Sequence, residues 1–191
     1  MDPIAKRNLD LSMRAIEGRD VAASLGPRPI AVIGARDGDR IGFATVAWAM
    51  PVSHTPPMVA FALRSKSYTF GLVRNTRRFS VSVPDASIDD AVKTIEICGN
   101  KTGSLVDKSE LIDWRLLPAA EKSIKEPLPA LAGALTVLEC RMEKIEPAGD
   151  HLLVIGYVDR AWSRGGSDAR GRLDATDALL CVQRDLFATA K

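Results

Sequence analysis

Short apolar runs separated by turn signals dominate the first half of the chain. Three of these runs have the length of buried strands: Ile30–Ala35, Ile41–Met50 and Met58–Leu63. Asp37-Gly38 between the first two runs is a strong hairpin signal, so we expect these strands to be antiparallel neighbours. Pro51 is expected to end the second strand, because proline cannot donate to a sheet ladder. The prolines of residues 53–57 then predict an extended loop that leads into the third strand.

Two helices and an intervening strand are predicted after these runs. Ser67 is a suitable N-cap for a short helix with one apolar stripe. Residues 79–83 alternate phenylalanine or valine with serine, which is the period of a half-buried strand. A weak capping box at Ser87 predicts a second helix that runs to Ile97. The apolar face of that helix is expected to contain Ile88, Val92 and Ile95.

Loops and two long strands make up the predicted second half. Loops or connectors are predicted at 98–104, 118–129 and 163–175, a helical turn at 109–114, and strands at 135–145, 151–162 and 179–187. The glycines of 163–175 indicate a mobile loop. Residues 1–24 show only weak helical periodicity, so we expect either one or two short helices or a lead-in segment that packs on the core.

The spacing of the strands determines the expected fold class. The first strands follow one another too closely for the crossover helices that a parallel sheet requires. The sequence therefore predicts a mainly β protein of the α+β class, built as an antiparallel barrel with peripheral helices. The 118–129 connector is too short to separate two stable domains, so residues 1–191 are predicted to form a single domain.

Composition narrows the possible partners. The 191 residues carry a formal net charge of +2, with scattered basic residues, so neither nucleic acid nor an anionic membrane is expected as a partner. No apolar run approaches the ~20 residues of a membrane-spanning helix, and the charged N-terminus does not resemble a signal peptide. The three cysteines are widely spaced without a CxxC motif. We therefore expect reduced thiols, no metal site and a cytoplasmic protein.

Residues 64–69 combine the groups that an organic phosphate requires. The segment reads Arg64-Ser65-Lys66-Ser67-Tyr68-Thr69. It offers two cations, a row of hydroxyls and the free N–H groups of a helix start. The alternative is that Ser67 only caps the helix while the cations are solvated. No GxGxxG or GxxxxGK[ST] motif occurs in the sequence, so a separate dinucleotide or triphosphate fold is not supported.

Five groups of residues follow one another in a recognisable order. They are Arg28–Ile30; Ala44–Trp48 with Pro51–Ser53 and Pro56-Pro57; Ser65–Thr69; Cys98–Gly103 with Asp107-Lys108; and Gly149–His151 leading to Gly156–Val158. In this order they resemble the flavin reductase-like proteins, whose fold is the FMN-binding split β-barrel. The resemblance implies a homodimer with FMN, or FAD, near its interface and NADH or NADPH as reductant. It also implies that electrons pass on to a flavin-dependent oxygenase or another acceptor.

The resemblance also implies functional positions. For the flavin ring these are Thr45, Val46, Ala47 and Trp48 with Ser53 in the following loop; for the phosphate side Arg64, Ser65, Lys66, Ser67 and Thr69; and for the ring edge Cys98, Asn100 and Lys101. His151 is the implied catalytic residue, where it would meet the nicotinamide or the flavin edge and assist proton delivery.

Four of these residues also fit a structural role. Trp48 suits either the flavin ring or the barrel core. Lys101 is either a cation beside reduced flavin or an exposed loop lysine. Cys98 is either reactive or a small packing residue, and the sequence shows no partner base for it. His151 is either catalytic or hydrogen-bonded to backbone at the start of a strand.

Two positions depart from the family pattern. Members commonly have Asn three residues before the Thr of the flavin strand, where this chain has Gly42, and Ser two residues after it, where this chain has Ala47. Both departures remove side-chain hydrogen bonds to a cofactor. Three functions therefore stay open: an NAD(P)H-dependent flavin reductase, a flavin-binding electron carrier without a nicotinamide reaction, and a barrel that binds another planar ligand. His151 and the glycine-rich 163–175 loop favour the first.

Overall fold

The computed structural model describes residues 14–119, 126–164, 177–183 and 186–189. Most of the predicted mobile loop at 163–175 lies outside these residues, as does the first part of the predicted lead-in. The described part of the lead-in contains one short helix, α1 (Arg19–Ala23), so one of the predicted short helices is confirmed.

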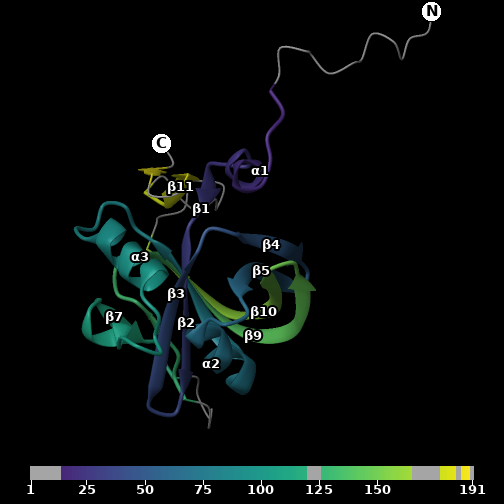
Figure 1. The fold of residues 1–191 in the computed structure, drawn as a ribbon. Coiled ribbons are helices and arrows are strands. Elements are labelled where there is room, and N and C mark those ends of the chain that lie inside the picture. Colours follow the sequence, from purple (N-terminus) through teal and green to yellow (C-terminus); the bar gives the residue numbers. More distant parts are fainter. Residues whose placement is uncertain (1–13, 120–125, 165–176, 184–185, 190–191) are drawn as a thin grey trace, which may run out of the picture.

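A curled antiparallel sheet of seven strands forms the centre of the molecule (Figure 1). The strands lie in the order β3-β2-β6-β9-β10-β5-β4. Their bounds are β2 (Ala31–Asp37), β3 (Arg40–Val46), β4 (Ala49–His54), β5 (Pro57–Arg64), β6 (Arg78–Pro84), β9 (Ala134–Ala148) and β10 (His151–Ser163). The sheet forms a barrel that stays split at its edge strands β3 and β4, which confirms the predicted antiparallel split barrel with peripheral helices.

Helices and two small sheets surround this barrel. Helix α2 (Tyr68–Thr76) packs on β2 and β3, α3 (Ala91–Asn100) packs on β3, and η1 (Lys108–Glu110) is a single 3-10 turn beside β3. A hairpin joins β7 (Trp114–Leu116) to β8 (Pro129–Leu131). A third sheet contains β1 (Arg28–Pro29), β11 (Leu179–Gln183) and β12 (Leu186–Thr189). Two predictions were therefore wrong: the helical turn at 109–114 shortens to η1, and the single C-terminal strand is a hairpin.

The predicted strand over Ile41–Met50 was also wrong. The sheet breaks at residues 47–48, so β3 ends at Val46 and β4 begins at Ala49. Pro51 lies inside β4 rather than ending a strand. Its missing N–H is tolerated there because β4 is an edge strand of the sheet. The loop predicted at 53–57 reduces to a tight turn between β4 and β5, and Ser53 therefore belongs to a strand.

The β6 strand is buried on both faces, so the prediction of a half-buried strand was wrong. Ser80 and Ser82 are 0% and 1% exposed. The Ser80 hydroxyl donates to the Pro129 carbonyl, and the Ser82 hydroxyl accepts from the Leu131 N–H. The β7–β8 hairpin therefore covers the outer face of β6, and the alternating serines bond to β8 instead of to water.

The second predicted helix is shifted along the chain. Helix α3 begins at Ala91, because the Ser87 hydroxyl and N–H bond to the Asp85 carboxylate instead of forming a capping box. The face of this helix that faces the barrel carries Ile95 and Cys98, whereas Ile88 and Val92 are exposed. The helix continues to Asn100, so the first residues of the loop predicted at 98–104 form its last turn.

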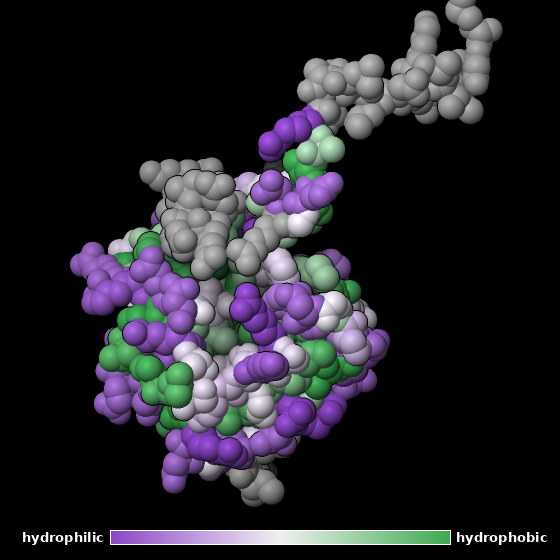
Figure 2. Space-filling model, viewed as in Figure 1, coloured by the Kyte–Doolittle hydropathy of each residue, from purple (hydrophilic) through white to green (hydrophobic). Residues whose placement is uncertain are grey.

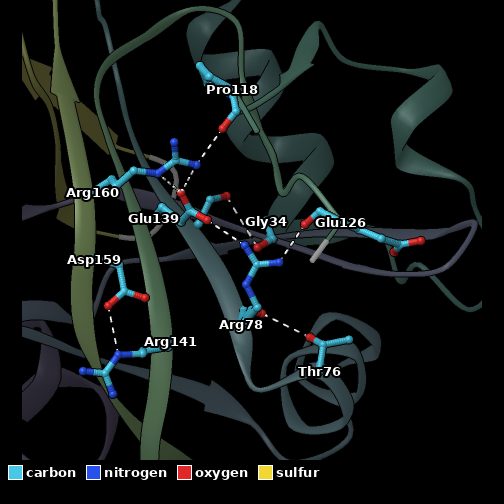
Figure 3. A network of polar contacts seen from close by, with 10 residues as sticks. Gly34, Thr76, Arg78, Pro118, Glu126, Glu139, Arg141, Asp159 and Arg160 are labelled. Carbon is cyan, nitrogen blue, oxygen red and sulfur yellow. Dashed lines mark hydrogen bonds and ion pairs between the residues drawn. The ribbon is translucent and has the colours of Figure 1, made fainter. Parts of the chain in front are cut away.

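A buried ionic cluster fixes the connector between β7 and β8 to the barrel (Figure 3). Glu139 on β9 is 7% exposed and accepts from Arg78 on β6 at 2.6 Å and from Arg160 on β10 at 2.6 Å. The two guanidinium groups also donate to the backbone carbonyls of Glu126 and Pro118, at both described ends of the connector. Two arginines thus share one carboxylate and connect three central strands with an outer segment.

The main core lies inside the barrel. Phe61 and Phe79 meet there edge to face with ring centroids 5.0 Å apart, and both are buried. Leu72 and Val73 of α2 close the same core. The outer surface is mixed: Figure 2 shows hydrophilic residues over most of the visible face, with smaller apolar patches between them.

Candidate functional site

The open edge of β3 is the first component of the site. Phe43 has its carbonyl on this edge, where Lys108 binds it, and the backbone groups of Thr45 point the same way because alternate residues share a strand edge. The Thr45 hydroxyl donates to the Ile95 carbonyl of α3 at 2.7 Å. That hydroxyl therefore orients α3, and the backbone of Thr45 is the part available to a ligand. Val46 is 3% exposed and belongs to the core, whereas Ala47 is half-buried.

The segment after α3 connects β3 with the start of α2. A Cβ atom at Gly99 would lie 3.4 Å from the Thr45 Cβ. A Cβ atom at Gly103 would lie 2.5 Å from a ring carbon of Tyr68, so only glycine allows this loop to lie so close to α2. Residues 99–103 therefore bring together two segments that are far apart in the sequence, the end of β3 and the 64–69 cluster.

The 64–69 cluster is largely available to solvent. Arg64, Ser65 and Lys66 are exposed, and Ser67 is half-buried. The Ser67 hydroxyl accepts from the Phe70 N–H at 3.4 Å, so the predicted N-cap is confirmed. The first N–H groups of a helix have no partner within it, and the two cations lie just before them.

Thr69 differs from the other members of this cluster. Its side chain is 2% exposed and faces β3, where the hydroxyl oxygen would lie 3.1 Å from a Cβ atom at Gly42. The Thr69 hydroxyl therefore packs against the barrel. The same contact explains the departure at Gly42, because a larger side chain there would occupy the space that α2 fills.

His151 stands at the start of β10, as predicted, and lies among other predicted site residues. Its Nδ1 atom is 2.7 Å from the Asp150 carboxylate. It pairs with Arg64 across the β5–β10 ladder. The ring of Trp48 lies 4.8 Å from the imidazole, centroid to centroid, at an interplanar angle of 53°. Trp48 is 43% exposed, which excludes the alternative that it belongs to the barrel core.

The Asp150–His151 pair has a defined electrostatic arrangement. The hydrogen bond from His151 lowers the pKa of the Asp150 carboxyl, and the nearby charges of His151 and Arg64 act in the same direction. The carboxylate is therefore ionised at neutral pH and holds the Nδ1 proton of the imidazole. The Nε2 atom is then the one that can exchange a proton with a ligand.

The remaining predicted residues are more scattered. Ser53 is half-buried on β4, where it pairs with Met58. Asn100 and Lys101 are exposed at the end of α3. Cys98 is 2% exposed, and burial raises the pKa of its thiol to about 12, against the lowering effect of Lys108. The thiol is therefore protonated at neutral pH, which supports the packing role rather than the reactive one.

The sequence reasoning missed the role of Lys108. This lysine is 6% exposed, and its Nζ atom donates to the carbonyls of Phe43 at 2.7 Å and Cys98 at 2.6 Å. Burial lowers the pKa of the ammonium group. Nothing in the charge pattern marks this residue, and only its place in the Asp107-Lys108 match pointed to the region.

A separate cavity of about 490 Å³ lies between α3 and the β7–β8 hairpin. Its walls include Lys93, Ile97, Leu111 and Asp113 but none of the predicted site residues. Among the described residues, no three His, Cys, Asp or Glu side chains are grouped so that they could hold a metal ion. No helix in the same part of the chain is long and apolar enough to cross a membrane.

Comparison with known proteins gives a consistent result. A family model for the flavin reductase like domain matches residues 24–189. An FMN-binding protein from Thermus thermophilus has a similar structure, with a TM-score of 0.78, 27% identity and coverage of 93% of this chain and 94% of that one. An NADPH-flavin oxidoreductase from Streptomyces viridifaciens is 29% identical over 135 residues, which are 70% of this chain and 66% of that protein.

The name of one further relative refers to a partner protein. The reductase component of a 4-hydroxyphenylacetate 3-monooxygenase from Thermus thermophilus is 25% identical over 130 residues, covering 68% of this chain and 73% of that protein. Several curated relatives are longer than the matched region, and the chain spans about half to two thirds of the length of the first of them.

Proposed function

Since the chain belongs to the flavin reductase-like family, we propose that it binds FMN and catalyses reduction of that flavin by NADH or NADPH. The observation that carries the proposal is the convergence of four predicted segments on one place. The end of β3, the 64–69 cluster and the 99–103 loop touch one another, and His151 lies beside Trp48 and Arg64.

The residues present fit the chemistry of FMN. A phosphate group requires cations and hydrogen-bond donors, which Arg64, Ser65, Lys66 and Ser67 supply at the start of α2. A flat ring requires close backbone groups, which the open edge of β3 and the residues 45–48 supply. Asn100 and Lys101 are exposed within the 99–103 segment, which touches Thr45 and Tyr68, whereas Ser53 lies at the end of β4 farther from Trp48, opposite Met58. FAD shares the ring and the first phosphate, so this set of residues accepts either flavin.

His151 and Trp48 form the wall on which a nicotinamide would dock. Bound flavin supplies the acceptor for a hydride, at its N5 atom. The protein's contribution is to hold both rings in position and to exclude water. His151, oriented by Asp150, presents Nε2 for proton delivery, and Trp48 offers an exposed aromatic face beside it.

The comparisons support a partner that receives the electrons. One relative is named as the reductase component of a 4-hydroxyphenylacetate 3-monooxygenase and another as the reductase subunit of a flavin-dependent monooxygenase. We infer that this chain delivers reduced flavin to such an oxygenase or to another acceptor. An electron carrier that binds flavin but does not react with nicotinamide is the alternative function.

Anaerobic titration distinguishes these possibilities. FMN-loaded protein is mixed with NADH, NADPH or dithionite, and bleaching of the flavin absorbance is followed. The proposed reductase is bleached by at least one nicotinamide at a rate above that of free FMN. Bleaching by dithionite but by neither nicotinamide would refute the reductase and support the electron carrier. Failure to bind FMN would refute both functions.

We also propose that two copies form the complete site. Trp48, Met50 and Val52 expose apolar side chains on and beside the edge strand β4. Leu153 and Ile155 on β10 alternate with the buried Val154, so they point away from the core. This outer apolar face adjoins His151, and a second copy is the expected cover. Sedimentation that shows only a 20.6 kDa species at micromolar concentration would refute it.

A further inference from the structure

Lys108 is a buried cation without an acidic partner. Its side chain lies on η1 and is 6% exposed. Among the described residues, no carboxylate forms an ion pair with it, and its two hydrogen-bond partners are neutral carbonyls. The Cys98 thiol does not neutralise it, because burial keeps that thiol protonated at neutral pH. A buried charge of this kind is costly and therefore calls for a functional explanation.

The two carbonyl bonds favour the charged form of the ammonium group. Distances of 2.6 and 2.7 Å are short even for a charged N–H donor. An unprotonated amine would still have two N–H donors for the two carbonyls, but a charged N–H donor forms the stronger hydrogen bonds with them. Hydrogen bonds to the charged form thus oppose the lowering of the pKa of Lys108 by burial.

Both carbonyls lie close to the candidate flavin site. Phe43 is two residues before Thr45 on the open edge of β3, and Cys98 directly precedes Gly99. Thr45 and Gly99 touch each other and form the wall between β3 and the 99–103 loop. Lys108 also connects η1 to the last turn of α3, since it binds the Cys98 carbonyl from the far end of the segment that follows α3.

We propose that Lys108 is an electrostatic and positioning residue of the flavin site, which stabilises bound flavin more strongly in the reduced state than in the oxidised state. The inference rests on the proposed function. Reduced flavin carries additional negative charge near N1 and O2, and a fixed cation in a low-dielectric wall favours that form. A residue with a purely structural role would stabilise the complexes with oxidised and with reduced flavin equally.

The test compares two affinities in four proteins. Wild type, Lys108→Met, Lys108→Gln and Lys93→Met are titrated anaerobically with oxidised FMN and with dithionite-reduced FMN. Lys108→Gln removes the charge but keeps a donor for one carbonyl, so it protects the fold. Lys93 is an exposed lysine of α3 that pairs with Asp90, and its variant controls for the loss of one positive charge elsewhere.

Both Lys108 variants are expected to lose about tenfold more affinity for reduced than for oxidised FMN, while Lys93→Met keeps the wild-type ratio. For a two-electron couple, a tenfold change in this ratio lowers the midpoint potential by about 30 mV. An unchanged ratio in Lys108→Gln, with wild type binding FMN normally, overturns this inference alone. Wild type that binds neither form of FMN overturns the proposed function and this inference together.

Discussion

A substitution at Gly42 would test how closely α2 packs on the barrel. A Cβ atom at this position would lie 3.0 Å from Leu72 Cδ1, 3.1 Å from the Thr69 hydroxyl oxygen and 3.3 Å from the Thr69 Cα. Leu72 and Thr69 are each 2% exposed, so neither side chain has free space to enter. The Thr69 Cα belongs to the helix backbone, and Gly42→Ala therefore forces α2 away from β3.

The magnitude follows from two opposing contributions. Overpacking a closed core costs about 1–3 kcal/mol, while replacing a strand glycine by alanine recovers roughly 0.5–1 kcal/mol of chain entropy. The net loss of unfolding free energy is about 0–2.5 kcal/mol, with a central value of about 1 kcal/mol. For a chain of this size the central value lowers the Tm by about 2–4 °C. Gly42→Asn, which restores the common family residue, is expected to lose more because its amide is larger and polar.

Gly71→Ala is the matched control on the same helix. A Cβ atom at Gly71 meets nothing within 4 Å, and alanine in a helix is better than glycine by roughly 0.5–1 kcal/mol. Thermal and urea unfolding should therefore show that Gly42→Ala and Gly42→Asn are less stable than wild type and that Gly71→Ala is more stable. If Gly42→Ala is as stable as wild type, α2 is not held at this distance and the explanation for Gly42 is wrong.

Three other substitutions test the site and the fold. Lys66→Ala is expected to weaken FMN binding about tenfold and leave riboflavin binding unchanged, since an exposed charge-assisted bond to phosphate contributes about 1.5 kcal/mol. Equal losses of affinity for both ligands, measured by flavin fluorescence, would contradict the phosphate site. His151→Ala is expected to slow flavin reduction by NAD(P)H by roughly 10²–10⁴-fold with a smaller effect on FMN affinity, and an unchanged stopped-flow rate would exclude a chemical role. Glu139→Gln should lower the free energy of unfolding by about 3 kcal/mol, because it leaves two arginines without their carboxylate. The control Glu146→Gln, at an exposed position, should stay within about 0.5 kcal/mol of wild type. Equal urea midpoints for the two variants would show that the ionic cluster is not stabilising.

Local sequence signals determined the elements that depend on neighbouring residues. The hairpin at Asp37-Gly38, the strand over Met58–Leu63 and the N-cap at Ser67 were all predicted, because turn chemistry, apolar runs and caps act over a few residues. The order of the family motifs gave the barrel class for the same reason. The resemblance depends on short matches that do not require knowledge of the packing.

Contacts between distant segments decided what the sequence could not show. Nothing near Pro51 indicates that its strand is an edge strand, and that position alone allows proline within β4. The serines of β6 are typical of an exposed face until the β7–β8 hairpin covers them.

The candidate functional site shows the same division between local sequence signals and contacts that depend on the fold. The sequence identified Trp48, Arg64 and His151 as separate residues on three segments, and only the pairing of β5 with β10 and with the chain before β4 brings them together. Lysine is ordinarily a surface residue, yet the fold buries Lys108 between β3 and the end of α3. Residue type and spacing thus determined which chemical groups this protein has. The tertiary structure decided which of them are buried, paired or available to a ligand, because burial and pairing depend on segments that meet only after the chain has folded.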